Sequence, residues 1–358
     1  MSQIVIIGGG VAGLSAGAAL CTHAQVTVIE AETSIGYHAS GRSAALFEPN
    51  YGNAPVRALS RASEAYHREA NGGYLSPRGF LLLGAAGDTP QFETDLAGLG
   101  CDEIGPAEAC NMVPILNTAH MNRAAYHAAA EDIDTDRLLQ DFAKQIRHNG
   151  GKVQTGAPVS AITRDAQQWR IEAASVSYTA DTLINAAGPW ADDIAQMAGI
   201  APLGLQPLRR SMARIAAPDA HDVSDWPMFF GAGETWYAKP DAGQLIVSPA
   251  EEHPCPPMDA WPDDMVLAEG FARYQEFVHP EITRPTATWA GLRTFAPDRA
   301  LVLGAEPDMP DFIWSAGQGG YGFQTGPAAG QTVAALALGR TPDLPADVIA
   351  ALSPARFR

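Results

Sequence analysis

The stretch IVIIGGGVAGLSAG, residues 4–17, decides the fold class of this chain. Its apolar run predicts a buried strand, its glycines predict a tight turn, and the small residues that follow predict a helix. The apolar VTVIE at 26–30 then predicts a second strand. Strand, turn, helix and strand form the context in which a G-x-G-x-x-G motif binds a dinucleotide, so we expect a Rossmann-like α/β domain at the start of the chain.

Each glycine of the motif has an expected task. Gly8 would make the turn, Gly10 would admit a pyrophosphate, and Gly13 would let the helix pack closely on the strand. Glu30 ends the second strand, where a carboxylate can accept both hydroxyls of an adenosine ribose. A glycine-rich turn that binds nothing would leave Glu30 unexplained.

Composition limits the class of protein. The chain has 358 residues, 46% hydrophobic and 18% charged, which indicates a soluble globular protein of two domains. We find no run of roughly 18 apolar residues and no secretory signal, so we expect a cytoplasmic protein without stable membrane insertion. The net charge of −17 disfavours nucleic acid as a partner. The four cysteines are scattered, so we expect neither a metal site nor a redox dithiol.

More α/β elements follow along the chain. Residues 133–153 predict a helix capped by Asp134 or Thr135 and then a strand. The segment 182–191, TLINAAGPWA, predicts a strand that ends in small residues. The segment 311–339 again predicts a strand, a glycine-rich loop and a helix.

Two other stretches are richer in proline, aromatic residues and short alternating runs. One of them contains Pro240-Asp241-Ala242-Gly243, which predicts a hairpin turn. We therefore predict an α/β fold in which an antiparallel or mixed-sheet substrate domain is inserted into a discontinuous nucleotide-binding domain. The predicted nucleotide-binding domain comprises 1–75, 131–205 and 289–358, and the predicted substrate domain comprises 76–130 and 206–288.

The loop GYHASGRS, residues 36–43, favours FAD over NAD as the dinucleotide. A nicotinamide enzyme usually continues from the acidic strand end into another crossover helix. Here a loop follows at once, and its hydroxyl and guanidinium donors suit pyrophosphate and ribityl oxygens. The donors are His38, Ser40, Arg42 and Ser43.

Several motifs in order along the whole chain resemble the D-amino-acid-oxidase superfamily of FAD enzymes, and within it the bacterial D-arginine dehydrogenases. The motifs are the opening fingerprint, GYHASGRSAA, IDTD, NAAGPW, QPLRRS, WYAKPDAG, TWAGLRTF and GQGGYG. The resemblance implies FAD as cofactor, and it implies the discontinuous two-domain fold that the composition also indicates. It further implies cofactor contacts at Gly41, Ala44, Ala187, Gly188, Trp190, Gly319, Tyr321 and Gly322.

The resemblance also implies the substrate site. Arg210 and Arg293 would hold a substrate carboxylate, because the planar guanidinium makes paired charge-assisted hydrogen bonds that lysine cannot reproduce. Tyr237 would lie beside that carboxylate, and Tyr51 would lie on a loop that closes over the site. The carbonyl of Gly320 would accept from the substrate amine. An interdomain ion pair or a core tyrosine is the alternative for each of these side chains.

The side-chain pocket departs from the D-arginine dehydrogenase pattern. Phe80 stands where that pattern has an acidic residue, and Leu46 and Glu48 stand where it has histidine and threonine. Met228 matches a pocket-lining methionine. The pocket is therefore expected to be apolar, and arginine would be a substrate only if Glu48 recognises a cationic side chain.

The second glycine run, GQGGYGFQTG at 317–326, would bring backbone close to the flavin ring. A helix starting near 324–326 would point its N-terminus at the flavin pyrimidine and favour the negative charge of the reduced ring. His38 stands in a context similar to that of a histidine that carries flavin covalently in dimethylglycine-dehydrogenase-like relatives. The closer resemblance favours noncovalent FAD.

These expectations combine into an activity: oxidation of a D-amino acid with an apolar or uncharged side chain to the 2-oxo acid through an imine, by hydride transfer from Cα to flavin N5. Oxidation of a secondary amine such as sarcosine or proline, oxidation of a 2-hydroxy acid, or a role as a flavin subunit of a larger complex are the alternatives. Lysine occurs only at 144, 152 and 239, and none is an obvious activator of oxygen, which favours a dehydrogenase that passes electrons to a quinone or another acceptor. The sequence predicts no oligomeric state.

Overall fold

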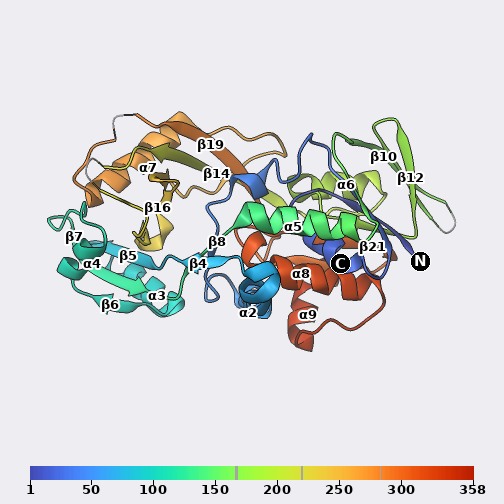
Figure 1. Ribbon diagram of the computed structural model, residues 1–358, viewed down its shortest axis with the longest axis horizontal. Helices are drawn as coiled ribbons and strands as arrows, with labels where there is room; N and C mark the ends of the chain where they lie inside the picture. Colours follow the sequence, from blue (N-terminus) through green and yellow to red (C-terminus); the bar gives the residue numbers. More distant parts are fainter. Residues whose placement is uncertain (166–167, 219–220, 283) are drawn as a thin grey trace.

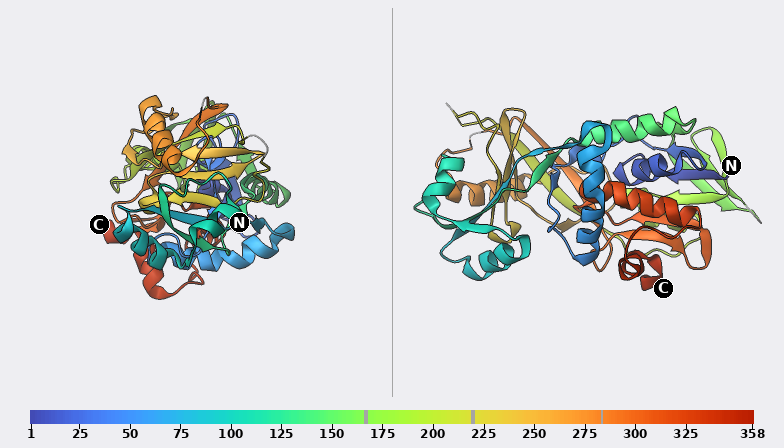
Figure 2. Two further views of the ribbon diagram at one scale, coloured as in Figure 1. Left: turned by 90° about the vertical axis from the view of Figure 1, so that its left-hand side faces the viewer. Right: turned by 60° about the horizontal axis from the view of Figure 1, so that its bottom comes forward.

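A computed structural model describes the chain except for residues 166–167, 219–220 and 283. The molecule is elongated, with a helix-covered parallel sheet at one end and a large mixed sheet at the other (Figure 1). Both chain termini lie at the end that holds the parallel sheet, and the right-hand view in Figure 2 shows the same division. This is the predicted α/β architecture with a second, inserted sheet.

The opening fingerprint folds as predicted. Strand β1 (Gln3–Ile7) is followed by α1 (Val11–Leu20) and β2 (Gln25–Ile29). Both strands pair in parallel. The six-stranded sheet has the order β20-β21-β13-β1-β2-β9, in which only the edge strand β20 is antiparallel to its neighbour. The other strands of this sheet are β9 (Lys152–Gln154), β13 (Thr182–Asn185), β20 (Val302–Glu306) and β21 (Met309–Ala316).

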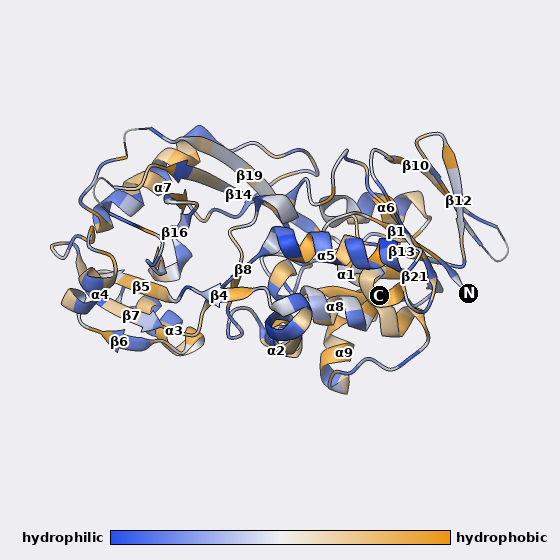
Figure 3. Cartoon of the chain, in the orientation of Figure 1, coloured by the Kyte–Doolittle hydropathy of each residue, from blue (hydrophilic) through white to orange (hydrophobic). Residues whose placement is uncertain are grey.

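Helix α1 lies between two other helices because its small residues let them approach. Helix α8 (Gly322–Ala337) packs on one side of it, where a Cβ on Gly330 would come within 2.5 Å of the Ser15 backbone. Helix α5 (Thr135–His148) packs on another side with five buried apolar residues, and the side chain of Asp134 caps it. Figure 3 shows hydrophilic and hydrophobic residues alternating along α5, as expected for a helix with one buried face.

The large sheet has nine strands and holds the other end of the molecule. Its main path is β18-β14-β17-β16-β15-β5-β7-β6, and β19 pairs with β14 beside this path. All pairings are antiparallel except that of β15 with β5, so the sheet is mixed, as predicted. The strands are β5 (Phe80–Ala85), β6 (Asp102–Ile104), β7 (Met121–His127), β14 (Gln206–Ile215), β15 (Met228–Gly231), β16 (Tyr237–Asp241), β17 (Gln244–Ser248), β18 (His253–Pro254) and β19 (Ala287–Phe295).

Two apolar layers cover this sheet. On one face, Phe229 and Trp236 pack against Tyr274 and Phe277 of α7 (Asp264–Phe277). On the other face, Phe80, Phe230 and Tyr237 belong to a second cluster that includes residues of α3 (Thr89–Leu99). The second face is the one that looks toward the parallel sheet, so its residues are placed to form a site between the two sheets.

Two sequence predictions need correction. The predicted boundary at 289 falls inside β19. Residues 287–295 all pair with β14, so this strand belongs to the large sheet. The predicted hairpin turn is shorter than expected, because Pro240 and Asp241 are still in β16 and only Ala242 and Gly243 connect it to β17. Pro240 is tolerated there because β15 pairs with β16 only at Tyr237 and Ala238, so no strand needs the missing N–H.

The remaining elements join or flank the two sheets. Helix α2 (Ala54–Glu69) lies across α8 near the middle of the molecule (Figure 1). In the part of the chain that the structure describes, no helix is long and apolar enough to span a bilayer. The other elements are β3 (Leu46–Phe47), β4 (Leu75–Pro77), β8 (Glu131–Ile133), β10 (Val159–Arg164), β11 (Trp169–Ala173), β12 (Val176–Ala180), α4 (Pro106–Met112), α6 (Ala191–Met197) and α9 (Ala346–Leu352), with short 3-10 turns at Ala39–Arg42, Ala70–Gly72, Gly188–Trp190, Ala232–Glu234 and Pro354–Phe357.

Candidate active site

Three adjoining cavities run from the parallel sheet to the large sheet. The nucleotide cavity, of about 370 Å³, is lined by Glu30, His38 and Trp190 among others. The middle cavity, of about 140 Å³, shares Gly10, Ser40 and Gly188 with it. The substrate pocket, of about 110 Å³, shares residues 43–46 and Arg210, Arg293, Gly320 and Gln324 with the middle cavity. The three cavities therefore form one continuous cleft between the two sheets.

The glycines of the fingerprint occupy the positions that their predicted tasks require. Gly8 has φ +115°, and a Cβ there would come within 2.2 Å of Ala186 O. A Cβ on Gly13 would come within 1.9 Å of Gly8 O, so the helix approaches the turn this closely only because Gly13 lacks a side chain. Gly10 lines both the nucleotide and the middle cavity, at the start of α1.

Glu30 lies at the edge of the nucleotide cavity with its carboxylate fixed by the backbone. Its Oε2 accepts from the N–H of Gly9 at 2.6 Å, and its Oε1 accepts from the N–H of Glu32 at 2.9 Å. Each oxygen keeps a further lone pair. Recognition of a ribose by Glu30 stays a prediction, but the carboxylate is held where that contact would be made.

The loop 36–45 separates into residues that line the cleft and residues that shape it. Ser40, Ser43, Ala44 and, on the facing strand end, Ala187 all line the cleft. Gly41 does not line it and instead donates its N–H to Gly36 O at 2.6 Å, which closes the turn.

Arg42, which is predicted to contact the cofactor, uses its side-chain donors within the protein. Its guanidinium donates to the carbonyl of Ala290 at 2.8 Å and to Oδ1 of Asp259 at 2.6 Å, and it also contacts the carbonyls of Tyr37 and Ala260. Although Arg42 lines the middle cavity, its donors are used within the protein. Arg42 therefore ties the cofactor loop to β19 of the large sheet, a role the sequence could not show because its partners lie far along the chain.

His38 lies at the nucleotide end of the cleft. Its Nε2 is 2.9 Å from Oε1 of Glu32, and its ring packs on Trp190 at 4.8 Å between centroids. His38 lines the nucleotide cavity and not the substrate pocket. His38 shares this cavity with Glu30, and noncovalent attachment of the flavin stays a prediction.

Besides Nη1 of Arg210, two buried polar groups in the middle cavity have no hydrogen-bond partner among the described residues. They are Thr294 Oγ1 and Gln318 Nε2. A buried polar group without a partner is costly, so such groups usually meet a ligand or ordered water. Their position beyond the fingerprint, with backbone of the second glycine run beside them, fits the polar edge of a flavin ring.

The second glycine run lines the middle cavity with Gly319, Gly320 and Gly322. Gly319 has φ +51°, and a Cβ there would be 2.3 Å from the Phe295 ring. Helix α8 begins at Gly322, slightly earlier than predicted, and Phe323 and Gln324 of its first turn also line the cavity. The first turn of α8 therefore borders the middle cavity, and its approach to the flavin stays a prediction.

Tyr321 does not line any of the three cavities, contrary to the prediction. Its buried ring packs against Tyr51 at 5.3 Å and against Phe295 at 6.1 Å between centroids. Tyr321 therefore supports Tyr51 from behind. The glycines on either side of it carry the backbone to the cofactor and leave the tyrosine facing away.

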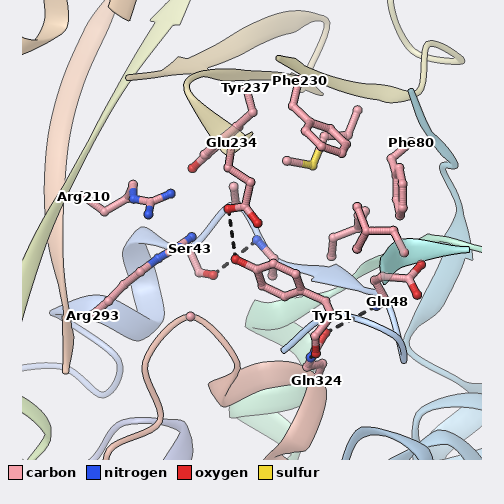
Figure 4. A pocket seen from close by; sticks show the side chains of 16 residues that line it. Ser43, Glu48, Tyr51, Phe80, Arg210, Phe230, Glu234, Tyr237, Arg293 and Gln324 are labelled. Carbon is pink, nitrogen blue, oxygen red and sulfur yellow. Dashed lines mark hydrogen bonds between the residues drawn. The ribbon is translucent and has the colours of Figure 1, made fainter. Parts of the chain in front are cut away.

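The two arginines of the predicted carboxylate clamp lie on neighbouring strands. Arg210 on β14 is opposite Gly291 of β19, and Arg293 of β19 is opposite Leu208. The two arginines are thus diagonal neighbours on one face of the ladder, where long side chains can meet. Both line the substrate pocket, and Figure 4 shows them on the same side of it.

The donors of this clamp are only partly used by the protein. Arg210 is 3% exposed, and its Nε and Nη2 donate to Glu251 O and Glu252 Oε1, but its Nη1 has no partner among the described residues. The guanidinium of Arg293 makes no hydrogen bond or ion pair with any residue that the structure describes. Two guanidinium groups with free donors in one pocket are suited to an anionic ligand.

Electrostatics in the pocket follow from burial and from neighbouring charges. Burial and the nearby Arg293 lower the pKa of Arg210. Burial also acts to lower the pKa of Arg293, but Tyr51, Tyr237 and Glu234 outweigh it and the pKa is raised. Both arginines remain cations, and a ligand carboxylate would relieve their mutual repulsion.

The predicted tyrosines complete the polar side of the pocket. The Tyr237 hydroxyl is buried and has no partner among the described residues. The Tyr51 hydroxyl donates to Oε2 of Glu234 at 3.1 Å. Burial, followed by the charge of Glu234, raises the pKa of Tyr51, so this hydroxyl stays protonated and available as a donor.

The opposite side of the pocket is apolar, as predicted. Leu46, Phe80 and Met228 line it, together with Phe230 and Leu99, which the sequence had not indicated. Figure 4 shows Phe80 and Phe230 facing the arginines across the pocket.

Glu48 is the polar residue of this side. Its Oε2 lies 3.1 Å from Nε2 of His127, and its Oε1 accepts from the N–H of Asn50. Burial raises the pKa of Glu48, against the lowering influence of Asn50 and His127. Oε2 is at ion-pair distance from His127 but makes no hydrogen bond to a described residue, so recognition of a cationic substrate side chain by Glu48 stays a prediction.

Sequence reasoning missed Glu234, Gln324 and His127. Glu234 lines the pocket from a 3-10 turn with φ +51°, a strained value for a residue that is not glycine. Oε1 of Gln324 accepts a hydrogen bond from the backbone N–H of Glu48 at 3.4 Å, and its Nε2 donates to the carbonyl of Tyr51 at 3.4 Å. Single polar residues in a turn or strand carry no periodic signal, so only the resemblance could have indicated them.

Lys239 lies on β16, just before the hairpin turn. Its Nζ contacts Ala44 O at 2.5 Å and Asp132 Oδ1 at 2.7 Å, and the residue does not line the cleft. The ammonium therefore fixes the segment 44–45 beside the cleft, and its contacts are within the protein.

Comparison with known proteins assigns the family. The sequence pattern of the family described as FAD dependent oxidoreductase, DAO, matches residues 3–336. This chain belongs to the DAO family. The cofactor of this FAD dependent oxidoreductase is accordingly FAD, and the cleft between fingerprint and second glycine run fits it.

Individual relatives of this DAO family member are distant. Human peroxisomal sarcosine oxidase is 28% identical over 223 residues, which are 58% of this chain and 55% of that protein. N-methyl-L-tryptophan oxidase of Salmonella agona is 28% identical over 232 residues, 61% of this chain and 59% of that protein. The matches thus span little more than half of each relative. They support the family, and they do not single out D-arginine dehydrogenase.

Solved structures confirm the fold. Glycine oxidase from Geobacillus kaustophilus superimposes with a TM-score of 0.84 and 22% identity, over 100% of both chains. The predicted mixed α/β fold with more than one sheet is therefore confirmed.

Proposed function

We propose that this FAD dependent oxidoreductase oxidises the amine of a small amino acid to an imine, with N-methylated and ring amino acids preferred. The observation that carries the proposal is the clamp: Arg293 with no protein partner in the described chain and Arg210 with a free Nη1, both in a pocket that opens into the cofactor cleft. Two free guanidinium donors fit one carboxylate.

Positioning is the main contribution of the protein to this chemistry. FAD, when bound, supplies the acceptor for the hydride that leaves the carbon next to the amine. The clamp fixes the substrate carboxylate at one end of the pocket, and the backbone of Gly320 lies where the pocket meets the middle cavity. Tyr237 and Tyr51 offer hydroxyl donors beside the clamp, and the buried walls exclude water from the reacting carbon.

The size of the substrate pocket and the names of the relatives favour a small amine as substrate. The pocket volume of about 110 Å³ is below the roughly 300–1,000 Å³ of sites for drug-sized ligands. The two relatives above are named for N-methyl amino acids, which carry a secondary amine. An apolar wall at Phe80, Met228 and Leu46 suits an N-methyl group or a proline ring.

A second candidate is the D-amino acid activity predicted from the sequence. The same apolar wall could receive the side chain of a primary D-amino acid, and the clamp would bind its carboxylate equally well. A 2-hydroxy acid would also satisfy the clamp. The products separate these candidates, because only a primary amine releases ammonia when its imine is hydrolysed.

The electron acceptor is proposed to be a quinone or another carrier. The lysine nearest the cleft, Lys239, is held by Ala44 O, Ala45 O and Asp132, so it is not placed to promote oxygen reduction at the flavin. Reoxidation of the reduced protein by air and by a soluble quinone should be compared directly. Air reoxidation as fast as turnover would replace this assignment by an oxidase.

The test of the proposed function is anaerobic mixing of the purified FAD-loaded protein with a panel of substrates. The panel holds sarcosine, D- and L-proline, glycine, apolar D-amino acids and 2-hydroxy acids, and the loss of oxidised flavin absorbance is followed. We expect the fastest bleaching from the secondary amines. Bleaching only by primary D-amino acids with release of ammonia would establish the second candidate, and no bleaching by any member of the panel would overturn both.

A further inference from the structure

Helix α8 contains a proline close to its flavin-facing end. Pro327 has no N–H, so the carbonyl of Phe323, four residues earlier, cannot receive its usual helical hydrogen bond. This carbonyl is buried, because Phe323 and Gln324 are 6% and 3% exposed. A buried carbonyl without a donor is destabilising, and here it lies in the turn that lines the cleft.

Helix α2 supplies the missing donor. Nε2 of His67 is 3.1 Å from Phe323 O and 3.3 Å from Gln324 O. Both of these acceptors are carbonyls, so Nε2 must carry the proton. His67 is 0% exposed and its ring packs on Phe47, and since its Nδ1 has no partner among the described residues, its polar contacts there are those to α8.

A second residue of α2 acts on the other side of the same interruption. The Oγ of Ser63 accepts from the N–H of Ala328 at 3.0 Å, directly after the proline. Ser63 and His67 are four residues apart on α2 and therefore lie on one face of it. Helices α2 and α8 pack side by side, with α2 crossing the flavin-facing end of α8 (Figures 1 and 2).

The turn held in this way is connected to both parts of the site. The main chain of Phe323 and Gln324 borders the middle cavity, where the first N–H groups of α8 would face the cofactor. The side chain of Gln324 contacts the backbone of Glu48 and Tyr51, which line the substrate pocket. A displacement of this turn would therefore change the contacts to the bound flavin and to Tyr51.

We propose that His67 and Ser63 are positioning residues for the cofactor, which hold the flavin-facing turn of α8 by replacing the hydrogen bonds that Pro327 interrupts. This inference depends on the FAD site and not on which amine is oxidised. Neither residue touches the cleft, so each acts through α8.

The test uses a matched pair and a rescue. His67→Leu removes the donor and His67→Gln keeps one, and each variant is made with and without Pro327→Ala, which returns an N–H to the helix. For each variant the dissociation constant for FAD and the two-electron reduction potential of bound FAD are measured. These readouts do not depend on knowing the substrate.

We expect His67→Leu to weaken FAD binding by about tenfold, the effect of one strong hydrogen bond, and to lower the potential because the helix N-terminus no longer favours the reduced ring. His67→Gln should stay within about threefold of the unsubstituted protein, below the effect of one whole hydrogen bond. In the Pro327→Ala background the penalty of His67→Leu should shrink to less than half, because residue 327 then donates to Phe323 O.

Two results would overturn the inference. One is a His67→Leu variant with unchanged FAD affinity and potential, and the other is an equal penalty with and without Pro327→Ala. If His67→Leu does not fold, Ser63→Ala against Ser63→Thr gives the same comparison, since Thr keeps the hydroxyl that Ala328 uses. Unchanged FAD affinity and potential in Ser63→Ala would then decide against the inference.

Discussion

Arg293 lies diagonally across the β14–β19 ladder from Arg210, because Arg293 is opposite Leu208 and Arg210 is opposite Gly291. Each strand contributes one guanidinium to the same face. The clamp is thus a property of strand register. A shift of one residue in this ladder would turn one arginine away from the pocket.

The clamp predicts different results for two substitutions at one position. Arg293→Ala should lower kcat/KM for any carboxylate substrate by at least about tenfold, or about 1.4 kcal/mol, which is the loss of one charged hydrogen bond. Arg293→Lys should recover only part of this loss, since an ammonium cannot make the paired contact. Steady-state kinetics check both, with Arg340→Ala, an exposed arginine beyond the far end of α8, as control. Unchanged kinetics in both variants would remove the clamp.

Removing the charge of Glu234 should strengthen the binding of a carboxylate, whereas removing the guanidinium of Arg293 should weaken it. Its carboxylate accepts from Tyr51 and raises the pKa of the nearby Arg293, so it offsets part of the positive charge of the clamp. Glu234→Gln keeps an acceptor for Tyr51 but removes the charge. A simple carboxylate such as acetate or benzoate should then bind about fivefold more tightly, roughly 1 kcal/mol for a partly screened charge. Titration of the flavin absorbance measures this. Weaker binding would indicate that Glu234 serves to orient Tyr51 and not to balance charge.

The parts of this protein that the sequence predicted are those whose interactions are local. Gly8, Gly10 and Gly13 act within one strand–turn–helix unit, where close backbone contacts demand glycine whatever the rest of the chain does. The cap of α5 by Asp134 is equally local. The assignment of 289–295 to the large sheet was missed because it depends on pairing with 206–212, and nothing within β19 itself specifies that partner.

The site divides in the same way. Arg210 and Arg293 were found through motifs, and the strand register confirms that they meet in one pocket. Arg42 was assigned to the cofactor because its neighbours in sequence suggested it, whereas its acceptors Asp259 and Ala290 come from the other sheet. Tyr321 is predicted to contact the cofactor, whereas its ring packs on Tyr51. Only tertiary packing decides whether the side chain between two glycines points into the cleft or away from it.

Neighbouring glycines of the second run should respond differently to alanine. Gly319→Ala would place a Cβ 2.3 Å from the Phe295 ring at φ +51°, so we expect a loss of about 1–3 kcal/mol in stability together with weaker FAD binding. Gly320→Ala has no positive φ, but its Cβ would lie 3.0 Å from Nη1 of Arg293. The Gly320→Ala variant should retain FAD. Its KM should rise about threefold or more, because misplaced hydrogen bonds to the substrate cost a few tenths to about 1 kcal/mol. Thermal unfolding, FAD titration and kinetics separate the two, and identical profiles would contradict the distinct roles.

The buried His67 predicts a pH dependence of stability. Burial lowers its pKa to about 4, with Arg68 adding to the effect and the carbonyls of Phe323 and Gln324 opposing it. In the unfolded chain a histidine has a pKa of about 6.5, so between these values the unfolded state binds the extra proton and the free energy of unfolding falls as pH falls.

The contribution of His67 is complete above about pH 6.5 and is lost toward pH 4, by up to about 3 kcal/mol if the full difference in pKa applies. Other groups titrate in the same range, so the informative quantity is the difference between the unsubstituted protein and His67→Gln, which cannot titrate there. Urea unfolding of the FAD-loaded proteins at pH 7.5 and pH 4.5 gives it. The unsubstituted protein should lose more stability on acidification than His67→Gln, and parallel losses would mean that the buried imidazole is protonated as easily in the folded chain as in the unfolded one.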